Sequence, residues 1–486
     1  MLKIERRKPL QAHVGVIGVG HHTYWAQFSG LLEVMQGKQA RFVQRLLAHG
    51  VRVSDFGLVD ESKSAYAALA LIRQANLDLL FVDMVTYATS ATFAPLVQGL
   101  DIPIVLVALQ PEMAMDYARG STFIQLSNDD FCSVPEFAST AVRMGKPVPA
   151  LILGHEQGDP AAEAEIGEWC RIAKALNDLK SARIGLMGHV LESMYDMHTD
   201  PALITREFGC HVVQCEPDEI LRLYRKVSEA DIAGMRERIL SFFRTPDPVS
   251  DAITFRLKPE DLHVAAKAAL ALERFAEEKE LTGLAYYYEA EPGSEMRELV
   301  TNFAVGNSLL IAAGFPMCGE FDLKTCLGML IMDRLEMGGS FAEFHPLDFK
   351  RGSVLVGHDG PHHLNIAAEK PVLRSLGLFH GKPGSGAGVE FKIQEGPLTM
   401  LSVTVNAQGR IKFVAAEGES LQGDIPPTGN TNSHAYFKPD LRTFLRRWTA
   451  QGPTHHFALG TGHRAGEILK LAGALRIEAV LVDIWS

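Results

Sequence analysis

The chain has 486 residues, which is more than one hydrophobic core usually supports, so its length predicts roughly two to four domains. Its formal net charge of −11 argues against nucleic-acid and anionic-membrane partners, because both bind clustered Lys and Arg. No apolar run approaches the ~20 residues that a membrane-spanning helix needs.

Two further features indicate a cytoplasmic protein. The basic N-terminus leads directly into a strand-like segment, without the apolar stretch and cleavage site of a signal peptide. The six cysteines show no CxxC spacing. We therefore expect reduced, buried thiols rather than a zinc site or a disulfide framework.

Strand and helix patterns alternate over the first part of the chain. The predicted strands are residues 13–20, 51–59, 77–85 and 102–109, and the predicted helices are residues 28–50 and 64–76. The strands are unbroken apolar runs, which is typical of a parallel sheet covered by helices on both faces. Ligands bind at the carboxyl ends of such strands, where this chain carries His21, His22, Tyr24 and Gln110.

A second alternation begins near residue 180. Strands are predicted at residues 182–190, 210–215 and 281–291, and helices at residues 219–227 and 259–279. Residues 307–335 have the pattern of a helix, a loop and a second helix. This stretch therefore predicts a second α/β domain.

The character of the sequence changes from about residue 338. Alternating apolar and polar residues, as in LSVTV and IKFVA, favour antiparallel strands, with turns such as NAQGR between them. Residues 423–439 are typical of a long loop, and a helix and a strand over residues 465–476 and 478–485 close the chain.

The predicted fold class is therefore α/β, with two doubly wound parallel-sheet domains followed by a strand-rich, β-barrel-like C-terminal domain. The predicted boundaries are residues 1–176, 177–337 and 338–486.

Four side chains stand out as candidate metal ligands. Glu320 lies in GEFDLKT, Glu343 in FAEF, His358 in VLVGH and His463 in GTGH. Two carboxylates and two imidazoles form a ligand set suited to Mn²⁺, Fe²⁺, Co²⁺ or Zn²⁺. Each residue also has an ordinary interpretation: an acid at a helix N-terminus, a solvated loop residue, a surface histidine, or a helix cap.

These segments, in this order, resemble the metal-site region of L-arabinose isomerases. That family carries a Gly-Glu-Gly-Asp-Trp-Lys-Thr motif, a Phe-Met-Glu-Asp-Tyr motif, a Leu-Gly-X-His element and a Gly-Gly-Ala-His-His turn followed by a helix and a strand. The matching pieces here are GEFDLKT, FAEF, VLVGH and GTGH leading into RIEAVLVD. The N-terminal VIGVGHHTY is more weakly similar to the family's VIGSQHLYG.

The resemblance implies a metal-dependent aldose–ketose isomerase acting on L-arabinose or a related aldose through an ene-diol. It places the four ligands of a divalent ion, with Mn²⁺ expected, at Glu320, Glu343, His358 and His463, and the two glutamates also serve as the acid/base pair. The family has two adjacent histidines at its last turn, where this chain reads His463–Arg464. Since arginine cannot coordinate a cation, we expect the ligand to be His463.

The resemblance also implies an assembly of identical subunits, a hexamer or a trimer. His21, His22, Tyr24 and Gln110 then correspond to positions that reach the sugar. The family's motifs are altered at Phe321, Leu323 and Phe344, so we expect the metal chemistry to be kept and the sugar pocket to differ.

Three alternatives stay open at this stage. The first is the same chemistry on another pentose, a 6-deoxyhexose or a modified sugar. The second is a non-catalytic sugar-binding protein, which also pairs two α/β domains, and the third is a metal-dependent lyase or epimerase. A nicotinamide-dependent dehydrogenase is disfavoured, because GVIGVGHH lacks the GxGxxG order.

Overall fold

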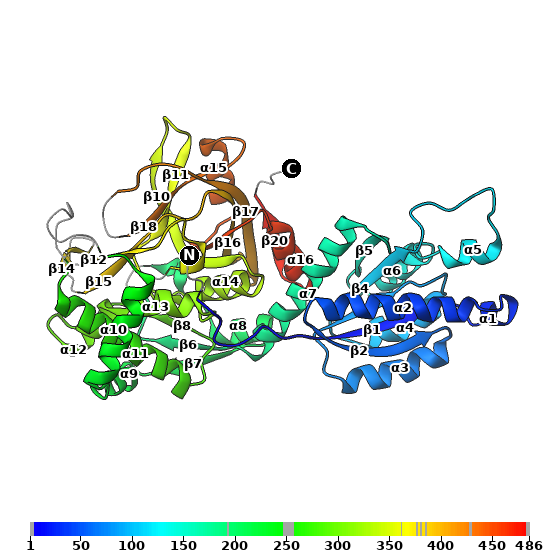
Figure 1. Cartoon of the computed structure of the whole chain (residues 1–486), viewed down its shortest axis with the longest axis horizontal. Coiled ribbons are helices and arrows are strands. Elements are labelled where there is room, and N and C mark those ends of the chain that lie inside the picture. The colour runs from blue at the N-terminus through cyan, green and yellow to red at the C-terminus, as the bar shows by residue number, and fades with distance from the viewer. Residues whose placement is uncertain are drawn as a thin grey trace. The chain divides into compact units, whose positions relative to one another are not determined.

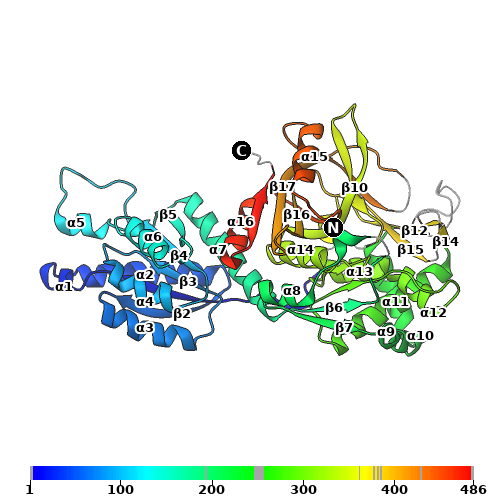
Figure 2. The same cartoon turned by 180° about the vertical axis from the view of Figure 1, so that it is seen from behind.

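The computed structural model describes residues 4–191, 194–245, 257–360, 362–375, 378–379, 382–383, 386–426 and 430–482. Two compact units divide the chain. The N-terminal unit is residues 10–178, and the C-terminal unit is residues 179–486 together with residues 1–9 (Figures 1 and 2). The predicted division into three domains stays a prediction.

The N-terminal unit is an all-parallel, five-stranded sheet in the order β2-β1-β3-β4-β5. Its strands are β1 (His13–Val19), β2 (Arg52–Val59), β3 (Leu79–Asp83), β4 (Ile104–Gln110) and β5 (Ala150–His155). Its helices are α1 (Thr23–Gln27), α2 (Leu31–Ala48), α3 (Ser62–Gln74), α4 (Ser90–Gly99), α5 (Thr122–Ser127), α6 (Val134–Arg143) and α7 (Pro160–Ser181), which runs on past residue 178. The predicted parallel sheet is confirmed, and β3 is buried along its whole length, as expected for a strand covered on both faces.

The C-terminal unit begins with a second parallel sheet in the order β7-β6-β8-β9. Its strands are β6 (Arg183–Met187), β7 (His211–Cys215), β8 (Gly283–Tyr286) and β9 (Met317–Cys318). The helices of this region are η1 (Tyr195–Met197), α8 (Pro201–Phe208), α9 (Pro217–Arg225), α10 (Glu229–Phe242), α11 (Pro259–Glu278), α12 (Glu295–Thr301), α13 (Phe303–Ala312) and α14 (Leu323–Arg334). Helix α14 is buried along its whole length, because it contacts both this sheet and the strands that follow.

The remainder of the unit is a mostly antiparallel sheet in the order β16-β19-β10-β11-β18-β17-β20. An additional pairing of β16 with β17 closes it into a barrel. Its strands are β10 (Gly338–Asp348), β11 (Ser353–His358), β16 (Gly396–Val405), β17 (Ile411–Leu421), β18 (Thr431–Tyr436), β19 (Phe457–Thr461) and β20 (Glu478–Leu481). Short elements complete it: η2 (Leu364–Ile366), β12 (Val372–Ser375), β13 (Leu378–Phe379), β14 (Lys382–Pro383), β15 (Ala387–Glu390), α15 (Leu441–Ala450) and α16 (Ala465–Leu475). The predicted strand-rich, barrel-like region is confirmed.

One expectation about this region is wrong in part. Residues 423–439 were expected to form a loop, and they include strand β18, which lies between β11 and β17. Its side chains are mostly small and polar, so the sequence lacks the apolar pattern that predicts a strand. They are nonetheless almost all buried, because the strand fills the gap that closes the barrel. The last part of the predicted final strand, residues 483–485, lies outside the described residues.

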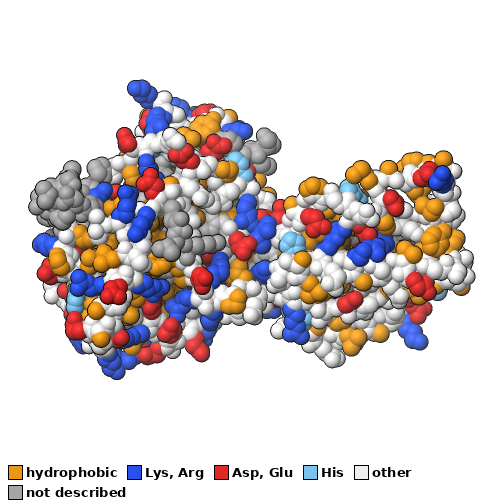
Figure 3. Space-filling model, viewed as in Figure 1, with side chains coloured by type: hydrophobic (Ala, Val, Ile, Leu, Met, Phe, Trp, Pro, Cys, Tyr) orange, Lys and Arg blue, Asp and Glu red, His pale blue; other side chains and the backbone are white. Residues whose placement is uncertain are grey.

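No helix in the described part of the chain is long and apolar enough to span a membrane. On the face shown in Figure 3, acidic and basic side chains are intermixed. That face therefore lacks the continuous basic surface on which nucleic acids bind.

Candidate active site

The candidate site lies within the C-terminal unit, where the barrel strands meet the second parallel sheet. Glu343 lies in β10, His358 is the last residue of β11, and residue 456 directly precedes β19. These three strands are neighbours, with Glu343 opposite Gly357 and Ala342 opposite Phe457. The register therefore brings Glu343, His358 and His456 to one end of three adjacent strands.

Glu320 reaches the same place from the parallel sheet. It follows β9, at the carboxyl edge where ligands of parallel sheets usually bind. Glu320 and Phe321 both adopt left-handed backbone conformations, with φ of 59° and 63°. This conformation costs roughly 1–2 kcal/mol for each residue that is not glycine. Such strain is concentrated at functional sites, where the surrounding structure maintains it.

The distances describe one compact cluster. The Nε2 atom of His358 lies 3.7 Å from Oε1 of Glu320 and 3.9 Å from Oε1 of Glu343. The Nε2 atom of His456 lies 3.6 Å from Oε2 of Glu320. Two overlapping groups of three residues, one with Glu320, His358 and His456 and the other with Glu343, His455 and His456, each bring their ligand atoms within 4.8 Å of one another.

The two imidazoles, those of His358 and His456, are each held by a hydrogen bond at the ring nitrogen that points away from the cluster. Nδ1 of His456 lies 3.0 Å from Oδ2 of Asp322, and Nδ1 of His358 lies 2.9 Å from the carbonyl oxygen of Asp359. Because both oxygens accept a hydrogen bond from Nδ1–H, each ring leaves the Nε2 lone pair facing the cluster. This is the usual arrangement behind a metal-bound histidine.

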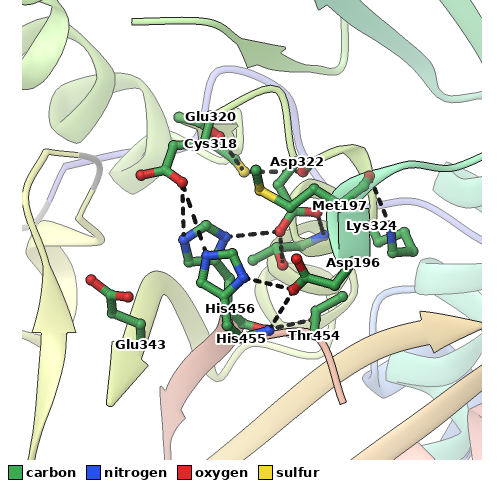
Figure 4. A network of polar contacts seen from close by, with 12 residues as sticks. Asp196, Met197, Cys318, Glu320, Asp322, Lys324, Glu343, Thr454, His455 and His456 are labelled. Atoms are coloured by element: carbon green, nitrogen blue, oxygen red, sulfur yellow. Dashed lines mark hydrogen bonds and ion pairs between the residues drawn. The ribbon is translucent and has the colours of Figure 1, made fainter. Parts of the chain in front are cut away.

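Asp322 also fixes the beginning of α14. Its carboxylate accepts hydrogen bonds from the backbone N–H of Thr325 at 3.0 Å and from its hydroxyl at 2.7 Å. The next residue but one, Lys324, is buried, and its ammonium donates to the carbonyl oxygens of Met197 and His198 at 3.0 and 3.2 Å (Figure 4). The GEFDLKT segment thus supplies one proposed ligand and the groups that hold its surroundings.

His455 is fixed by a second carboxylate. Its Nδ1 lies 2.6 Å from Oδ2 of Asp196, and its backbone N–H donates to the same oxygen at 3.0 Å (Figure 4). Burial lowers the pKa of His455, but the hydrogen bond to Asp196 and the charges of Asp196, Glu320 and Asp322 together outweigh burial and leave that pKa raised. The Nε2 atom of His455 lies 4.0 Å from Oε2 of Glu320, so this ring also borders the cluster.

Burial shifts the protonation of the central groups. It raises the pKa of Glu320, against the opposing effect of the two neighbouring histidines. It lowers the pKa of His358 well below the ordinary value, and His456 acts in the same direction. A neutral His358 has a lone pair available for a cation.

The cluster fits a divalent ion. Oε2 of Glu320 and Nε2 of His456 are buried and have no hydrogen-bond partner, although they lie only 3.6 Å apart. Unpaired buried polar atoms are costly, and a cation between them would remove the cost.

The prediction for the fourth ligand differs from this geometry. His463 lies beyond the far end of β19, and its Nε2 is 3.0 Å from the carbonyl oxygen of Gly418. The five residues of β19, about 17 Å of extended chain, separate it from His456. His456, not His463, accompanies Glu320, Glu343 and His358.

The sequence contained a signal for His456. Residues 452–456 read GPTHH, which matches the family's Gly-Gly-Ala-His-His turn more fully than GTGH does. The two adjacent histidines are both present there. GTGH lies one strand later in the chain, at the other end of β19, and Arg464 stands there in place of the second histidine.

The other sequence candidates lie in the N-terminal unit. The ring of His21 lies 5.2 Å from that of His22 and 5.1 Å from that of Tyr24, after β1. Gln110 ends β4, and its amide donates to the carbonyl oxygen of Glu112 at 2.6 Å. All four lie at the carboxyl edge of their sheet as expected, and their contact with a sugar stays a prediction.

One of the three altered motif positions, Phe344, does not face the cluster. Leu323 is buried in α14. Phe344 packs on the aromatic rings of Phe437, Phe444 and Phe457, because successive strand residues point to opposite faces and Glu343 occupies the site face.

Comparison with known proteins gives one consistent relationship. Residues 338–478 match the model of the L-arabinose isomerase C-terminal domain. An L-arabinose isomerase of Yersinia pseudotuberculosis serotype O:1b (strain IP 31758) is 24% identical over 432 residues, covering 85% of this chain and 83% of that protein. An L-arabinose isomerase of Yersinia pestis is 24% identical over 431 residues, with the same coverage.

The matched domain contains Glu343, His358 and His456, and the longer alignments extend over most of the chain. Among solved structures, A-type ketoreductases from a modular polyketide synthase align over 63% of this chain with 12% identity and a TM-score of 0.21, which is too low to bear on the fold.

Proposed function

From the premise that this chain is a divergent member of the L-arabinose isomerase family, we propose that it is a metal-dependent aldose–ketose isomerase. The proposed reaction interconverts L-arabinose and L-ribulose, or a closely related aldose and its ketose. The observation that carries the metal assignment is the convergence of Glu320, Glu343, His358 and His456 around unpaired, buried ligand atoms.

The chemistry requires a proton to move between two adjacent carbons of the sugar. A divalent ion held by these residues, with Mn²⁺ expected, would supply the Lewis acidity that polarises the sugar carbonyl. Glu320 and Glu343 approach His358 Nε2 to 3.7 and 3.9 Å, so both carboxylates border the same space. One takes the proton from carbon to give the ene-diol, and the other transfers the hydroxyl proton.

The remaining residues hold this machinery in place. Asp322 and the Asp359 carbonyl keep the two imidazoles turned toward the cluster, and neither imidazole adds negative charge that would weaken the Lewis acid. The raised pKa of Glu320 suits a group that must accept a proton and return it during each turnover.

The resemblance also supports a homo-oligomeric, cytoplasmic enzyme, a hexamer or trimer, in which His21, His22, Tyr24 and Gln110 contact the sugar. Light scattering of the purified protein measures the assembly. A panel of aldoses with Mn²⁺ identifies the substrate, and a ketose formed faster from another pentose or a 6-deoxyhexose would replace L-arabinose.

The deciding experiment compares His456→Ala with His463→Ala. We expect wild type and His463→Ala to hold about one divalent ion per chain and to form ketose. His456→Ala should lose the ion, or lose at least about 10²-fold in turnover. Metal analysis and ketose formation measure both. Full occupancy and normal turnover in His456→Ala would refute the ligand set, and tight sugar binding without metal or turnover would favour a binding protein.

A further inference from the structure

The first residues of the chain belong to the C-terminal unit, although the N-terminal unit follows them directly in sequence. Ile4 is 5% exposed and lies in the core of the C-terminal unit. Its N–H donates to Oδ1 of Asn365 at 3.1 Å, and its carbonyl accepts from Nδ2 of the same side chain at 3.2 Å. We call residues 4–7 the N-terminal strap.

Arg6 is the charged anchor of the strap. Its Nη1 lies 2.7 Å from Oδ2 of Asp333, and its Nη2 donates to the carbonyl oxygen of Asp333 at 2.7 Å. The Asp333 side chain is 6% exposed and also contacts Arg334. Hydrogen bonding from His363 and the two guanidinium groups outweigh burial and keep the pKa of Asp333 below its usual range. Asp333 therefore remains a carboxylate inside the protein.

Asp333 connects the strap to the turn that carries a proposed ligand. Its Oδ1 lies 3.3 Å from Nε2 of His363, and the backbone N–H of His363 donates to the hydroxyl of Ser340 at 2.9 Å. His363 directly precedes η2, whose Asn365 is held by Ile4. The strap therefore contacts residues 363–366 in two ways: Ile4 bonds Asn365 directly, and Arg6 binds Asp333, which contacts His363.

The other end of that turn sets the orientation of His358. The carbonyl of Asp359 accepts from Nδ1 of His358 at 2.9 Å and leaves Nε2 facing Glu320 and Glu343. The strand pairing of β11 fixes the backbone of His358, but its ring depends on the position of the Asp359 carbonyl. A displaced turn would move that carbonyl.

We propose that Arg6 is a positioning residue of the metal site: by binding Asp333, it fixes residues 362–366 and with them Asp359, whose carbonyl orients the imidazole of His358. This inference rests on the proposed function only in taking His358 as a ligand. Arg6 itself does not touch the cluster, so its effect is on metal affinity and on the order of the turn.

Arg7 provides a matched control on the same strap. Its guanidinium pairs with Glu277 at 3.0 Å, and the Glu277 side chain is 69% exposed. Exposed pairs of this kind contribute little to stability. Arg6→Ala and Arg7→Ala remove the same atoms from adjacent positions of the strap, but only Arg6→Ala removes a partner of Asp333.

The test uses the full-length protein and two measurements. The first is calorimetric titration with Mn²⁺ alone. We expect Arg6→Ala to bind roughly 10-fold more weakly, the lower end of the range for residues behind metal ligands, and Arg7→Ala to match wild type. The second is hydrogen exchange of the metal-free proteins, in which residues 359–360 and 362–366 should exchange faster in Arg6→Ala only.

Unchanged Mn²⁺ affinity and unchanged exchange in a folded Arg6→Ala would overturn the inference, as would equal losses in Arg7→Ala. If Arg6→Ala does not fold, Arg6→Lys decides the question. Lysine keeps the charge but cannot make both guanidinium contacts, so weakened binding supports the inference and wild-type behaviour refutes it. If wild type binds no Mn²⁺, the proposed function fails, and the exchange measurement alone still tests Arg6.

Discussion

At the scale of single residues, the site depends on carboxylates whose surroundings set their roles. Asp322 is fully buried, and burial raises its pKa, but the hydrogen bond and charge of His456, the charge of Lys324 and the N–H of Thr325 together outweigh burial and keep that pKa below the usual range. It accepts from Nδ1 of His456, whose other nitrogen faces Glu320. Asp322 therefore fixes the tautomer that can bind a cation.

Asp322→Asn tests this role. The amide oxygen can still cap α14. The amide nitrogen that replaces the second carboxylate oxygen cannot accept the hydrogen bond from Nδ1–H of His456. We expect metal affinity to fall by about 10–100-fold, measured by Mn²⁺ titration. Thr325→Ala, which removes another contact of the same carboxylate, should bind as wild type does. Equal affinity in all three proteins would contradict the prediction.

At Asp83, in the N-terminal unit, burial outweighs the favourable charge nearby and raises the pKa. Burial raises its pKa from 3.8 to about 8, and Lys38 offsets only part of that effect. Its Oδ2 is buried with no hydrogen-bond partner. The folded state therefore favours the protonated acid, and between pH 4 and 8 the unfolded chain ionises while the folded one does not. Wild type should lose stability over that interval.

Asp83→Asn should remove this loss. Its gain in melting temperature over wild type is expected to grow from about pH 4 to about pH 8 and then to level off, because each pKa unit corresponds to about 1.4 kcal/mol. Thermal unfolding at several pH values measures it. Asp116→Asn, at a side chain that is 61% exposed, is the control. A gain independent of pH would show that Asp83 is ionised in the folded protein.

At the scale of elements, strand pairing brings the proposed ligands close together. His358 ends β11, and Gly357 beside it pairs with Glu343 on one side and Asn432 on the other. A Cβ atom at Gly357 would lie 1.9 Å from the carbonyl oxygen of Thr431. The close approach of β11 and β18 therefore requires glycine, and β18 is the strand that closes the barrel next to the site.

Gly357→Ala should separate these strands. We expect a loss of roughly 3 kcal/mol or more in the free energy of unfolding, with weaker Mn²⁺ binding because His358 moves. Gly473→Ala in α16 is the matched control. A Cβ there meets nothing within 4 Å, and the helix should gain about 0.5–1 kcal/mol. Denaturant unfolding compares the two, and a wild-type-like Gly357→Ala would show that the strands can yield.

At the scale of the whole molecule, the proposed ligands all belong to the C-terminal unit, and residues 10–178 contribute none of them. An ion that binds only the folded unit stabilises it by about 2.7 kcal/mol at a hundredfold excess over its dissociation constant.

Removing the ion with a chelator should therefore destabilise the C-terminal unit selectively. We expect hydrogen exchange to rise in its buried strands and to stay unchanged in β1 and β3 of the other unit. Native-state exchange followed by mass spectrometry, with and without Mn²⁺, resolves the two. Equal changes in both units would mean that they unfold as one, or that the ion binds elsewhere.

The fold was largely accessible from the sequence because most of its strands are buried apolar runs. Apolar composition predicts the strands of the parallel sheets, and alternation of apolar and polar residues predicts several strands of the barrel. Strand β18 did not, because its short polar side chains are buried only by their neighbours in the closed sheet.

The sequence by itself determined the α/β and barrel architecture and three of the four clustered side chains, Glu320, Glu343 and His358, because strand patterns and short motifs are local. Tertiary structure decided the fourth member of the cluster, His456. The chain has a histidine near each end of β19, His456 before it and His463 after it. The pairing of β19 with β10 determines which of the two lies beside the glutamates. The left-handed backbone at Glu320 and the anchoring of Arg6 to Asp333, 327 residues away, likewise arise only when separate segments pack together.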